Sequence, residues 1–511
     1  MNPTVDLRDT RIDYDLLSIF PPEFLIAQLI FPLHDDGEAI QVAMADPNNL
    51  EKVAMVENFV RKTVVPLQAD RDEIERLLKR SDTFTQALKQ KTETFFQKRS
   101  SREIEEEAIS IEQVTEEDDS VIQLLNNIVF SAVNKKASDI HLESQAGSVV
   151  VKFRIDGILH QVMEPLDPLY HMPLLTRLKV ISELDIAERR VPQDGRFRLK
   201  FKRKTIDFRV SIMPGIYGEN AVIRILDREM ITENIGELKL SQLGFSDSLL
   251  EMILYYITQP YGMFLVTGPT GSGKTTTLYA ALNQIKKPED KIITIEDPVE
   301  YQISGITQIP VNEKKGLTFA RGLRSILRHD PDKIMVGEIR DPETAQIAIQ
   351  SALTGHLVFT TVHANNVFDV LGRFIHMGVD TYSFVSSLNC IVAQRLVRVL
   401  CPECRRRVRL TEKDFRFNRI DAESFPRQVF EARGCPECGG LGYSGRTAIG
   451  EILELTDDIK EMILQKKPTS EIKKVAMSQG MLPIRLNGLE KVKNGETSLE
   501  ELNRVTIKEW L

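Results

Sequence analysis

The clearest chemistry in the sequence lies in residues 268–275, which read Gly-Pro-Thr-Gly-Ser-Gly-Lys-Thr. In this pattern a glycine-rich loop wraps a phosphate with its backbone N–H groups. An apolar run at 263–267 precedes the loop and a helical stretch at 275–285 follows it, as the pattern requires. We expect Lys274 to contact the β- and γ-phosphates and Thr275 to bind Mg²⁺. The residues expected to bind the nucleotide are Gly268, Pro269, Thr270, Gly271, Ser272, Gly273, Lys274, Thr275 and Thr276.

Hydrolysis also needs a group that orients or deprotonates water, and an acid ends the apolar run 334–338. Most P-loop enzymes have Asp where Gly337 stands, so we expect Glu338 to activate the attacking water, directly or by orienting it. The acidic partner of the metal then comes from another strand, at 291–295, which is followed by Glu296, Asp297 and Glu300. The alternative for these acids is a solvated turn.

Two histidines, His356 and His363, flank the apolar run 357–362. Their odd spacing would place them on opposite faces of one strand, so that one faces the nucleotide and the other faces a neighbour or the core. Nearby threonines suit a phosphate sensor, whereas the plainer interpretation is a histidine satisfied within the core.

Cationic residues in two regions could neutralise the charge that develops on a γ-phosphate. Arg196 and Arg209 belong to an earlier domain, and Arg324 and Arg328 precede Glu338. The competing interpretation is that they are surface arginines, solvated or paired with acids.

Four of the five cysteines form two near-identical motifs, Cys401-Pro-Glu-Cys404 and Cys435-Pro-Glu-Cys438. Two residues between thiolates let both bind one tetrahedral ion, so we expect a closed, structural zinc site of Cys401, Cys404, Cys435 and Cys438. Coincidental pairing and reduced free thiols are the alternatives. The fifth, Cys390, lies in an apolar stretch and is expected to be a small buried filler.

The elements that must position these residues follow from hydrophobic periodicity and composition. After residue 230, short apolar strands alternate with helices, which predicts a parallel α/β sheet. Apolar residues at helical spacing over 121–133, followed by short strands, predict a separate α+β domain. The expected parts are an N-terminal docking domain at 1–80, an acidic linker at 81–120, the α+β domain at 121–229 and the ATPase domain at 230–511, with the zinc subdomain at about 398–445 and a helical part at 446–511.

Composition narrows the class of protein. The chain has 511 residues, of which 42% are hydrophobic and 27% charged, values typical of ordinary globular domains. Its net charge of -8 argues against wholesale nucleic-acid binding. The apolar runs are too short for a transmembrane helix, and the N-terminus lacks the pattern of a signal peptide. We therefore expect membrane contact only through partners.

On its motifs the sequence resembles the type II secretion ATPases (general secretion pathway protein E) and the related type IV pilus assembly and retraction ATPases. The resemblance covers about residues 121–506 and is carried by many motifs in one order. The matching segments are Ala137-Ser-Asp-Ile-His-Leu-Glu143, Phe153-Arg-Ile-Asp-Gly157, Gln193-Asp-Gly-Arg196, Arg209-Val-Ser211, the glycine-rich loop, Ile295-Glu-Asp-Pro-Val-Glu300, Arg328-His-Asp-Pro-Asp332, Gly337-Glu-Ile-Arg-Asp341, Thr354-Gly-His-Leu-Val-Phe-Thr-Thr-Val-His363 and Gln394-Arg-Leu-Val-Arg398.

The resemblance implies a RecA-like P-loop ATPase domain, a preceding PAS-like α+β domain, a small N-terminal α/β docking domain and a zinc-binding subdomain. It also implies a homo-hexamer of two-lobed subunits that hold ATP and Mg²⁺ between the lobes. The residues to which it gives roles are Lys274, Thr275, Glu338, Glu300, His356, His363, Arg196, Arg209, Arg324 and Arg328. The sequence departs from the family pattern at Asn220, which removes one candidate cation, and at His329.

The resulting hypothesis is a motor ATPase that is peripheral on the cytoplasmic face of the inner membrane and drives pseudopilus assembly for protein export. Its N-terminal domain would dock on the cytoplasmic domains of inner-membrane secretion proteins. Type IV pilus assembly is the nearest alternative. A nucleic-acid motor, which the acidic balance disfavours, and a nucleotide-binding scaffold without useful turnover are the rivals from other classes.

Overall fold

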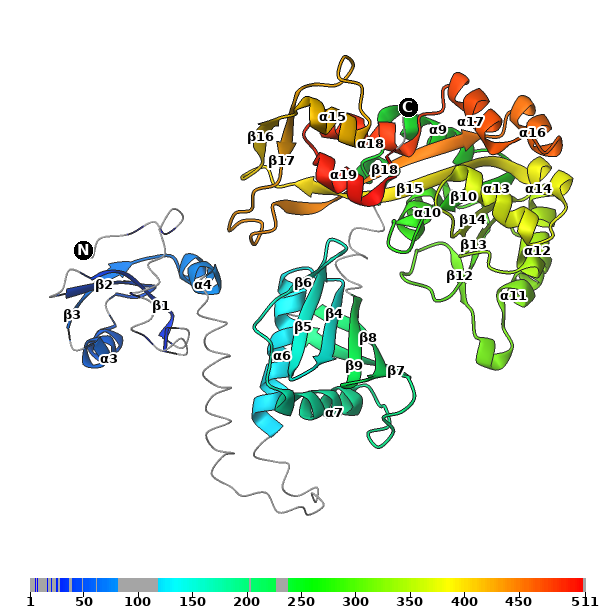
Figure 1. Cartoon of the computed structure of the whole chain (residues 1–511). Helices are drawn as coiled ribbons and strands as arrows, with labels where there is room; N and C mark the ends of the chain where they lie inside the picture. The colour runs from blue at the N-terminus through cyan, green and yellow to red at the C-terminus, as the bar shows by residue number, and fades with distance from the viewer. Residues whose placement is uncertain are drawn as a thin grey trace. The chain divides into compact units, whose positions relative to one another are not determined.

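The protein is described by a computed structural model that divides into two units, Met1–Phe197 with Phe208–Ile225, and Arg198–Asp207 with Leu226–Leu511 (Figure 1). The predicted linker lies outside the described residues except for its end, where a helix begins, and so does the predicted hinge after residue 226. The residues described are 28–35, 39–47, 49–60, 62–80, 118–201, 204–226 and 238–508, together with isolated positions between 5 and 25.

The N-terminal part contains a three-stranded sheet in the order β1-β2-β3. Strands β1 and β2 are antiparallel, and β2 and β3 are parallel because helix α3 connects them. Strand β2 and helix α4 lie near residues 40–44 and 70–80. The bounds are β1 Ile30–Asp35, β2 Ala39–Met44, α3 Leu50–Val60, β3 Thr63–Gln68 and α4 Arg71–Arg80.

The second part of this unit is a six-stranded sheet in the order β6-β5-β4-β9-β8-β7. Ile140 and Leu142 of β4 are buried, and Figure 1 shows helices α6 and α7 beside the sheet. Because side chains alternate along a strand, His141 between them faces the other side of the sheet. The bounds are α6 Asp118–Asn134, β4 Asp139–Gln145, β5 Ser148–Ile155, β6 Ile158–Gln161, η2 Pro168–Tyr170, α7 His171–Ile181, β7 Gln193–Phe201, β8 Lys204–Gly215 and β9 Gly218–Leu226.

Two cross-strand contacts fix the register of β7 against β8. The rings of Phe197 and Phe208 stack with centroids 4.6 Å apart, and Arg198 forms an ion pair with Asp207. Arg196 precedes these contacts on β7, and Arg209 follows them on β8.

The larger unit is built on a seven-stranded sheet in the order β12-β11-β13-β14-β10-β15-β18. The first six strands pair in parallel, which confirms the predicted α/β sheet, and β18 adds an antiparallel edge strand. The bounds are β10 Gly262–Thr267, β11 Ile292–Glu296, β12 Thr307–Pro310, β13 Lys333–Val336, β14 Leu357–Val362, β15 Leu388–Leu400 and β18 Tyr443–Glu454.

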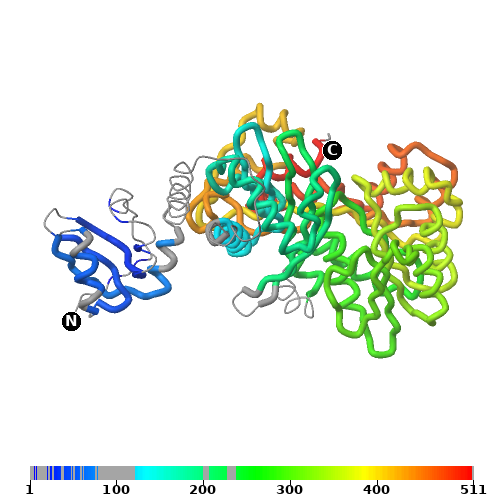
Figure 2. The backbone as a smooth tube through the Cα atoms, turned by 90° about the horizontal axis from the view of Figure 1, so that it is seen from below, coloured from blue at the N-terminus to red at the C-terminus, as the bar shows by residue number. Residues whose placement is uncertain are grey.

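Two hydrophobic cores cover the two faces of this sheet. Met263 and Leu265 of β10 belong to one core, with α11–α14, α16 and α17, whereas Phe264 and Val266 belong to the other, with α9 and α10. Figure 2 shows the yellow segments of α13 and α14 beside the orange-red segments of α16 and α17. The bounds are η3 Leu240–Gln242, α9 Asp247–Ile257, α10 Lys274–Ile285, η4 Glu313–Lys315, α11 Phe319–Ile326, η5 Leu327–His329, α12 Pro342–Leu353, α13 Val367–His376, α14 Thr381–Ser387, α16 Asp457–Leu464 and α17 Thr469–Ser478.

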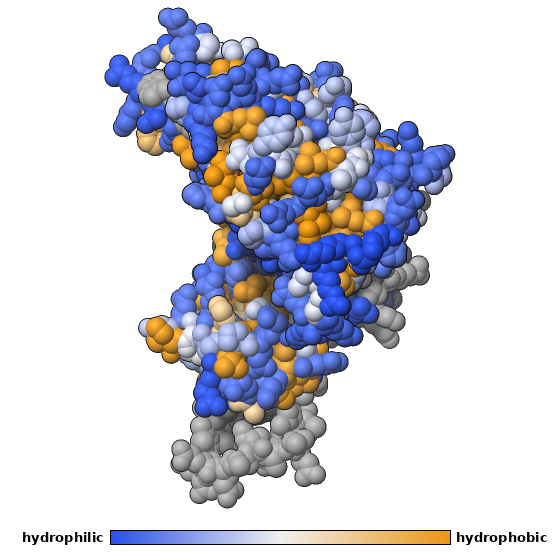
Figure 3. Space-filling view, turned by 90° about the vertical axis from the view of Figure 1, so that its right-hand side faces the viewer, coloured by the Kyte–Doolittle hydropathy of each residue, from blue (hydrophilic) through white to orange (hydrophobic). Residues whose placement is uncertain are grey.

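The surface of the molecule on the side of α12 and α14 is mixed, with hydrophobic areas among polar ones (Figure 3). Ile375 and Tyr382 are among its exposed apolar residues. Isolated exposed apolar side chains are normal in globular proteins. Among the described helices, none combines the length and the apolar character needed to cross a bilayer.

The final part of the chain packs on the far ends of β15 and β18. Buried Glu501 accepts hydrogen bonds from Arg398 of β15 and from Arg504, which ties the last helix to the sheet. Cys390 is buried, as predicted. The bounds are β16 Arg406–Arg409, α15 Glu412–Asn418, β17 Gln428–Glu431, α18 Ile484–Lys493 and α19 Leu499–Val505.

Candidate nucleotide site and cysteine cluster

The glycine-rich loop leaves the end of β10 and enters α10, as the sequence predicts. Gly273 has a φ of 86° and caps the helix, a conformation that side-chain-bearing residues rarely adopt. At Gly268 a Cβ atom would lie 2.5 Å from Ser272 Oγ and 2.6 Å from Gln394 O. Both glycines are therefore required for the loop to close over the end of the strand.

Polar groups line the inside of this loop. Lys274 is buried, and its Nζ donates to Gly268 O at 2.9 Å and Pro269 O at 3.1 Å. Burial lowers the pKa of Lys274 to about 8, against the opposing effect of the Glu338 charge. Ser272 Oγ is buried without a hydrogen-bond partner among the described residues. A phosphate oxygen would satisfy both groups, so these residues fit a bound nucleotide.

Thr275 and Thr276, in contrast, are exposed on the first turn of α10. A hydroxyl at this position can reach a metal ion that bridges the phosphates. The magnesium role of Thr275 stays a prediction.

Glu338 lies two residues beyond β13 and belongs to a charged cluster. Its carboxylate forms an ion pair with Arg340 and approaches His363 Nε2 at 3.5 Å. Arg340 also lies 3.8 Å from a carboxylate oxygen of Asp297. The sequence predicts Glu338 and His363 as site residues, and the structure brings them together; it adds Arg340, which the sequence reasoning missed.

His363 is held as a hydrogen-bonding group rather than as a permanent cation. Burial lowers its pKa, the nearby Lys274 charge lowers it further, and Glu338 opposes them. Arg373 donates to the His363 backbone carbonyl at 3.0 Å and thereby fixes the segment after β14. A neutral imidazole near neutral pH can respond to a nearby phosphate by hydrogen bonding.

The absence of the usual aspartate at Gly337 has a steric cause. A Cβ there would lie 3.2 Å from Ile295 O and 3.3 Å from the Glu296 Cα, tighter than most real contacts. The close approach of β11 to the end of β13 therefore favours glycine, and the acid must come from the next residue.

The acidic segment after β11 divides into a structural and an accessible part. Glu296 is buried and accepts hydrogen bonds from Thr294 Oγ1, Gln308 Nε2 and Tyr279 OH. Burial and the Glu296 charge raise the pKa of Tyr279, so this phenol stays protonated and donates. Glu296 is thus used inside the fold, whereas Asp297 is exposed and Glu300 is half-buried. The metal role of Glu300 stays a prediction.

The structure does not bring His356 to this cluster within the chain. His356 precedes β14, and its backbone carbonyl accepts from Gly262 N at the beginning of β10, at the opposite edge of the sheet from the loop. A six-residue strand separates the two edges by about 20 Å. The Nδ1 atom of His356 lies 3.0 Å from Ser351 O, so the ring has a hydrogen-bond partner within its own chain, as in the plainer interpretation. The functional role of His356 stays a prediction.

No contact between the predicted arginines and the loop is found among the described residues of the ATPase unit. Arg328 belongs to η5, which leads into the beginning of β13 at that same opposite edge. Arg324 is exposed and forms an ion pair with Glu343. Arg196 and Arg209 belong to the six-stranded sheet of the other unit. The roles of all four stay predictions.

Gln394 of β15 is a second residue that sequence reasoning left without a role. Its Nε2 donates to Ser272 O at 2.7 Å, and its Oε1 accepts from Thr277 Oγ1 at 2.9 Å. It therefore braces the loop from the neighbouring strand. The signal was present, because Gln394 opens one of the matching motifs, but a motif alone does not show what its first residue touches.

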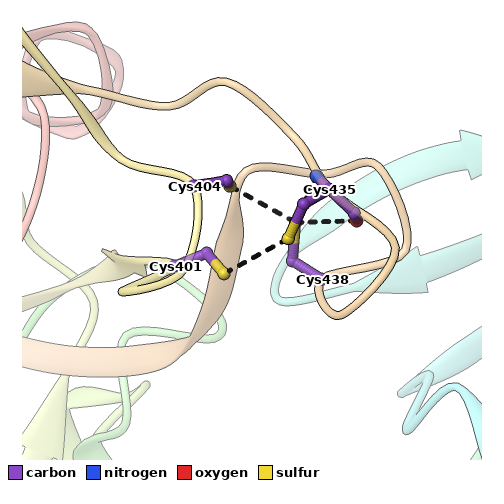
Figure 4. Close-up of side chains that lie close together, drawn as sticks. All are labelled: Cys401, Cys404, Cys435 and Cys438. Atoms are coloured by element: carbon purple, nitrogen blue, oxygen red, sulfur yellow. Dashed lines mark hydrogen bonds between the residues drawn. The ribbon is translucent and has the colours of Figure 1, made fainter. Parts of the chain in front are cut away.

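The four predicted cysteines converge at the far ends of β15 and β18 (Figure 4). Their sulfur atoms lie within 4.8 Å of one another, and three of the S–S distances are 3.8, 3.8 and 3.7 Å. A tetrahedron of thiolates with metal bonds of about 2.3 Å has edges of roughly 3.8 Å. The cluster could therefore hold a metal ion.

Backbone N–H groups complete this cluster. Cys438 Sγ accepts from Cys435 N at 3.2 Å and from Gly442 N at 3.1 Å. Burial would raise the pKa of the Cys438 thiol, but these N–H groups outweigh it and lower the pKa to about 7. Hydrogen bonds of this kind orient ligands and favour the thiolate form that binds a metal.

Comparisons with known proteins agree over most of the chain. Residues 114–504 match the family described as Type II/IV secretion system protein, and residues 2–85 match the MshEN domain. The type IV pilus assembly ATPase PilB of Myxococcus xanthus is 38% identical over 98% of this chain and 88% of its own. The type II secretion system protein E of Pseudomonas aeruginosa is 45% identical over 77% of each chain.

Solved structures agree on the fold. The Legionella pneumophila ATPase DotB, at 20% identity, covers 75% of this chain and 95% of its own with a TM-score of 0.52. At this identity the likeness shows the arrangement of elements alone.

The ion pair between Arg340 and Glu338 predicts that a substitution at Arg340 affects turnover more than nucleotide binding. Replacing Arg340 with Ala frees the carboxylate, so we expect kcat to fall about tenfold or more while the Kd for ADP changes less than about twofold. Arg427→Ala, which breaks a surface ion pair with Glu412, is the matched control. Steady-state turnover and ADP titration give both values. Equal losses in binding and turnover would contradict a positioning role for Arg340.

The lowered pKa of Lys274 predicts proton uptake on nucleotide binding. A pKa of about 8 in the free protein, raised by the bound phosphates, gives uptake of about three-quarters of a proton at pH 8.5 and about a tenth at pH 7. Calorimetric titration with ADP in buffers of different ionisation enthalpy measures this number. Lys274→Arg should bind without the buffer dependence because its guanidinium stays protonated. The same buffer dependence in the Arg variant would assign the uptake to another group.

Proposed function

Because the chain belongs to the Type II/IV secretion system protein family, we propose that it is a homo-hexameric motor that powers pseudopilus assembly and protein export by a type II secretion system. It is an ATPase, as its relatives are. The observation that carries the proposal is the convergence of the glycine-rich loop, Glu338 and His363 at one edge of the sheet. A phosphate-binding loop and an acid that can activate water therefore lie at the same edge of the sheet.

The proposed chemistry assigns one task to each group. Lys274 and the loop amides bind the phosphates, and Glu338, oriented by Arg340, positions or deprotonates the attacking water. His363 contacts the terminal phosphate or the residues that do. Thr275 and Glu300 would hold a magnesium ion, which would neutralise charge on the phosphates.

We assign Arg196 and Arg209 to the charge that develops during phosphoryl transfer. They belong to neighbouring strands, β7 and β8, of the six-stranded sheet. Arginines supplied from another domain or subunit are a recurrent device in these reactions. Closure of the two lobes on the nucleotide would then be the step that produces mechanical work. Arg324 and Arg328 would serve as further cationic contacts to phosphate.

The alternative function is type IV pilus assembly. It is favoured by a relative named for that process that aligns over almost the whole chain, N-terminal part included. The higher identity to a type II secretion protein, over a shorter stretch, favours the main proposal. A nucleic-acid motor is disfavoured by the net charge of -8.

The N-terminal part supports the proposed partners and location. Its three-stranded domain has its own hydrophobic core, and the described residues of this domain present no cluster of catalytic type. We propose that it docks on cytoplasmic domains of inner-membrane secretion proteins, which would place the motor on the cytoplasmic face of that membrane. Nucleic acid is not an expected partner.

Gene disruption tests the function directly. Loss of the gene should abolish export of secreted proteins while surface pili persist, and Glu338→Gln should fail to restore export although the wild-type gene does. Loss of pili with normal export would instead establish the pilus function. Turnover stimulated by DNA in a salt-sensitive way would mark a nucleic-acid motor and overturn both.

We propose that the cysteine cluster binds zinc, since four thiolates at tetrahedral spacing form the closed site typical of structural zinc. Metal analysis of the purified chain should give about one zinc per chain. Replacing Cys401 and Cys404 with Ser should remove the metal and lower the melting temperature. Cys390→Ala, at the remaining cysteine, should keep it. A metal-free wild-type chain would reject the site.

A further inference from the structure

Buried Glu451 on β18 joins two helices that are far apart in the sequence. Its Oε1 accepts from Val367 N at 3.2 Å, at the beginning of α13, and its Oε2 accepts from Ile484 N at 2.9 Å, at the beginning of α18. One carboxylate therefore accepts from the first backbone N–H group of each helix, although α13 also has a side-chain cap from Asn366. Helix α13 directly follows the segment that carries His363, and α18 begins the C-terminal helical part.

The negative charge of Glu451 is opposed by the positive ends of the two helices that it contacts. A helix N-terminus carries roughly half a positive charge, so two of them offset about one carboxylate. The charges of Lys473 and Arg395 act on Glu451. Burial raises the pKa of Glu451 above its usual range, while the two backbone N–H groups and these cations oppose the rise. The N-cap residue of α18 is Pro483, whose side chain cannot accept a hydrogen bond.

A line of contacts runs from this joint to the phosphate loop. Arg395 donates to Asn365 O at 2.6 Å, between His363 and α13, and to Gln394 O at 3.0 Å. Gln394 in turn holds the loop through Ser272 and Thr277. On the other side, Thr267 at the foot of the loop bonds the backbone of Ala364 at 3.0 Å.

We propose that Glu451 is a positioning residue that couples the nucleotide site to the C-terminal helix α18, with Gln394 and Arg395 as the link to the phosphate loop. When the loop closes on phosphate, the segment around His363 and the beginning of α13 become ordered with it. Glu451 transmits this ordering to the beginning of α18 because its second oxygen is bonded there. The inference rests on the ATP-binding part of the proposed function.

Hydrogen exchange in the full-length protein tests the coupling. Saturating ADP with Mg²⁺ should slow deuterium uptake of peptides covering 363–370 and also of peptides covering 484–490. In Glu451→Gln, ADP should still bind and protect the loop at 268–276, but the added protection at 484–490 should disappear. The amide of Gln has one acceptor oxygen and a donor NH2 group, so it can accept from only one of the two backbone N–H groups.

Matched variants separate coupling from a general loss of structure. Glu454→Gln lies on the same strand, but its carboxylate accepts from Tyr256, so the protection at 484–490 should survive. Gln394→Met keeps the size of the side chain but removes both bonds to the loop. It should weaken ADP binding about fivefold or more and also reduce protection at 484–490 at saturating ADP.

Turnover gives an independent readout. Glu451→Gln should lower kcat about fivefold or more while the Kd for ADP stays within about twofold, because the residue touches no ligand. Glu451→Asp should recover part of the rate.

The outcomes distinguish the coupling from the proposed function. If the wild-type protein binds ADP but shows no change at 484–490, the coupling is refuted while the ATPase assignment stands, and this holds even if Glu451→Gln fails to fold. Unchanged protection in Glu451→Gln refutes it equally. A wild-type protein that does not bind ADP refutes the proposed function, and the coupling with it.

Discussion

The parallel pairing of β10 between β14 and β15 is the constraint on which the nucleotide site depends. Thr267 at the end of β10 pairs with Val362 of β14 and with Ala393 of β15. The residues that follow on these strands, Gly268, His363 and Gln394, therefore reach one level of the sheet. Because the carboxyl ends of parallel strands meet at one edge, the polar groups gather there without any local sequence contact between them.

The same edge concentrates groups whose burial would be costly if they were alone. Lys274 is buried against loop carbonyls, Glu338 is paired with Arg340, and Glu296 is surrounded by three donors. A buried polar network stabilises a single arrangement only when each member has its partners. Burial lowers the pKa of Lys274 and the pKa of His363, which both lie at this edge. Added phosphate charge would favour the protonated form of Lys274.

The elements could be predicted from the sequence more fully than the contacts between them. The loop, the helix at 121–133, the strand 357–362 and the four-cysteine cluster depend on patterns that are local or on well-defined ligand spacing. The strand order could not be predicted, since β14 is the neighbour of β10 although three strands of that sheet, β11, β12 and β13, lie between them in the chain. For the same reason the sequence did not show that His356 lies at the opposite edge, that Glu296 is used inside the fold, or that Arg340 and Gln394 contact the site.

The long pair β15–β18 explains why two chemically unrelated sites belong to one structure. Near its inner end it carries Gln394 and Glu451, and at its outer end the strands leave register between Arg398 and Leu400, where the cysteine cluster begins. Beyond the sheet, this strand pair shares a hydrophobic core with α18 and α19. Cys401 N bonds to Gly442 O at 3.0 Å, and Leu400 N bonds to Glu496 O at 2.8 Å, so the tip is tied to the cluster and to the last helices. A metal bridge there would restrict fraying of the same two strands that brace the phosphate loop. The stability of the cysteine cluster and the geometry of the nucleotide site therefore both depend on the β15–β18 strand pair.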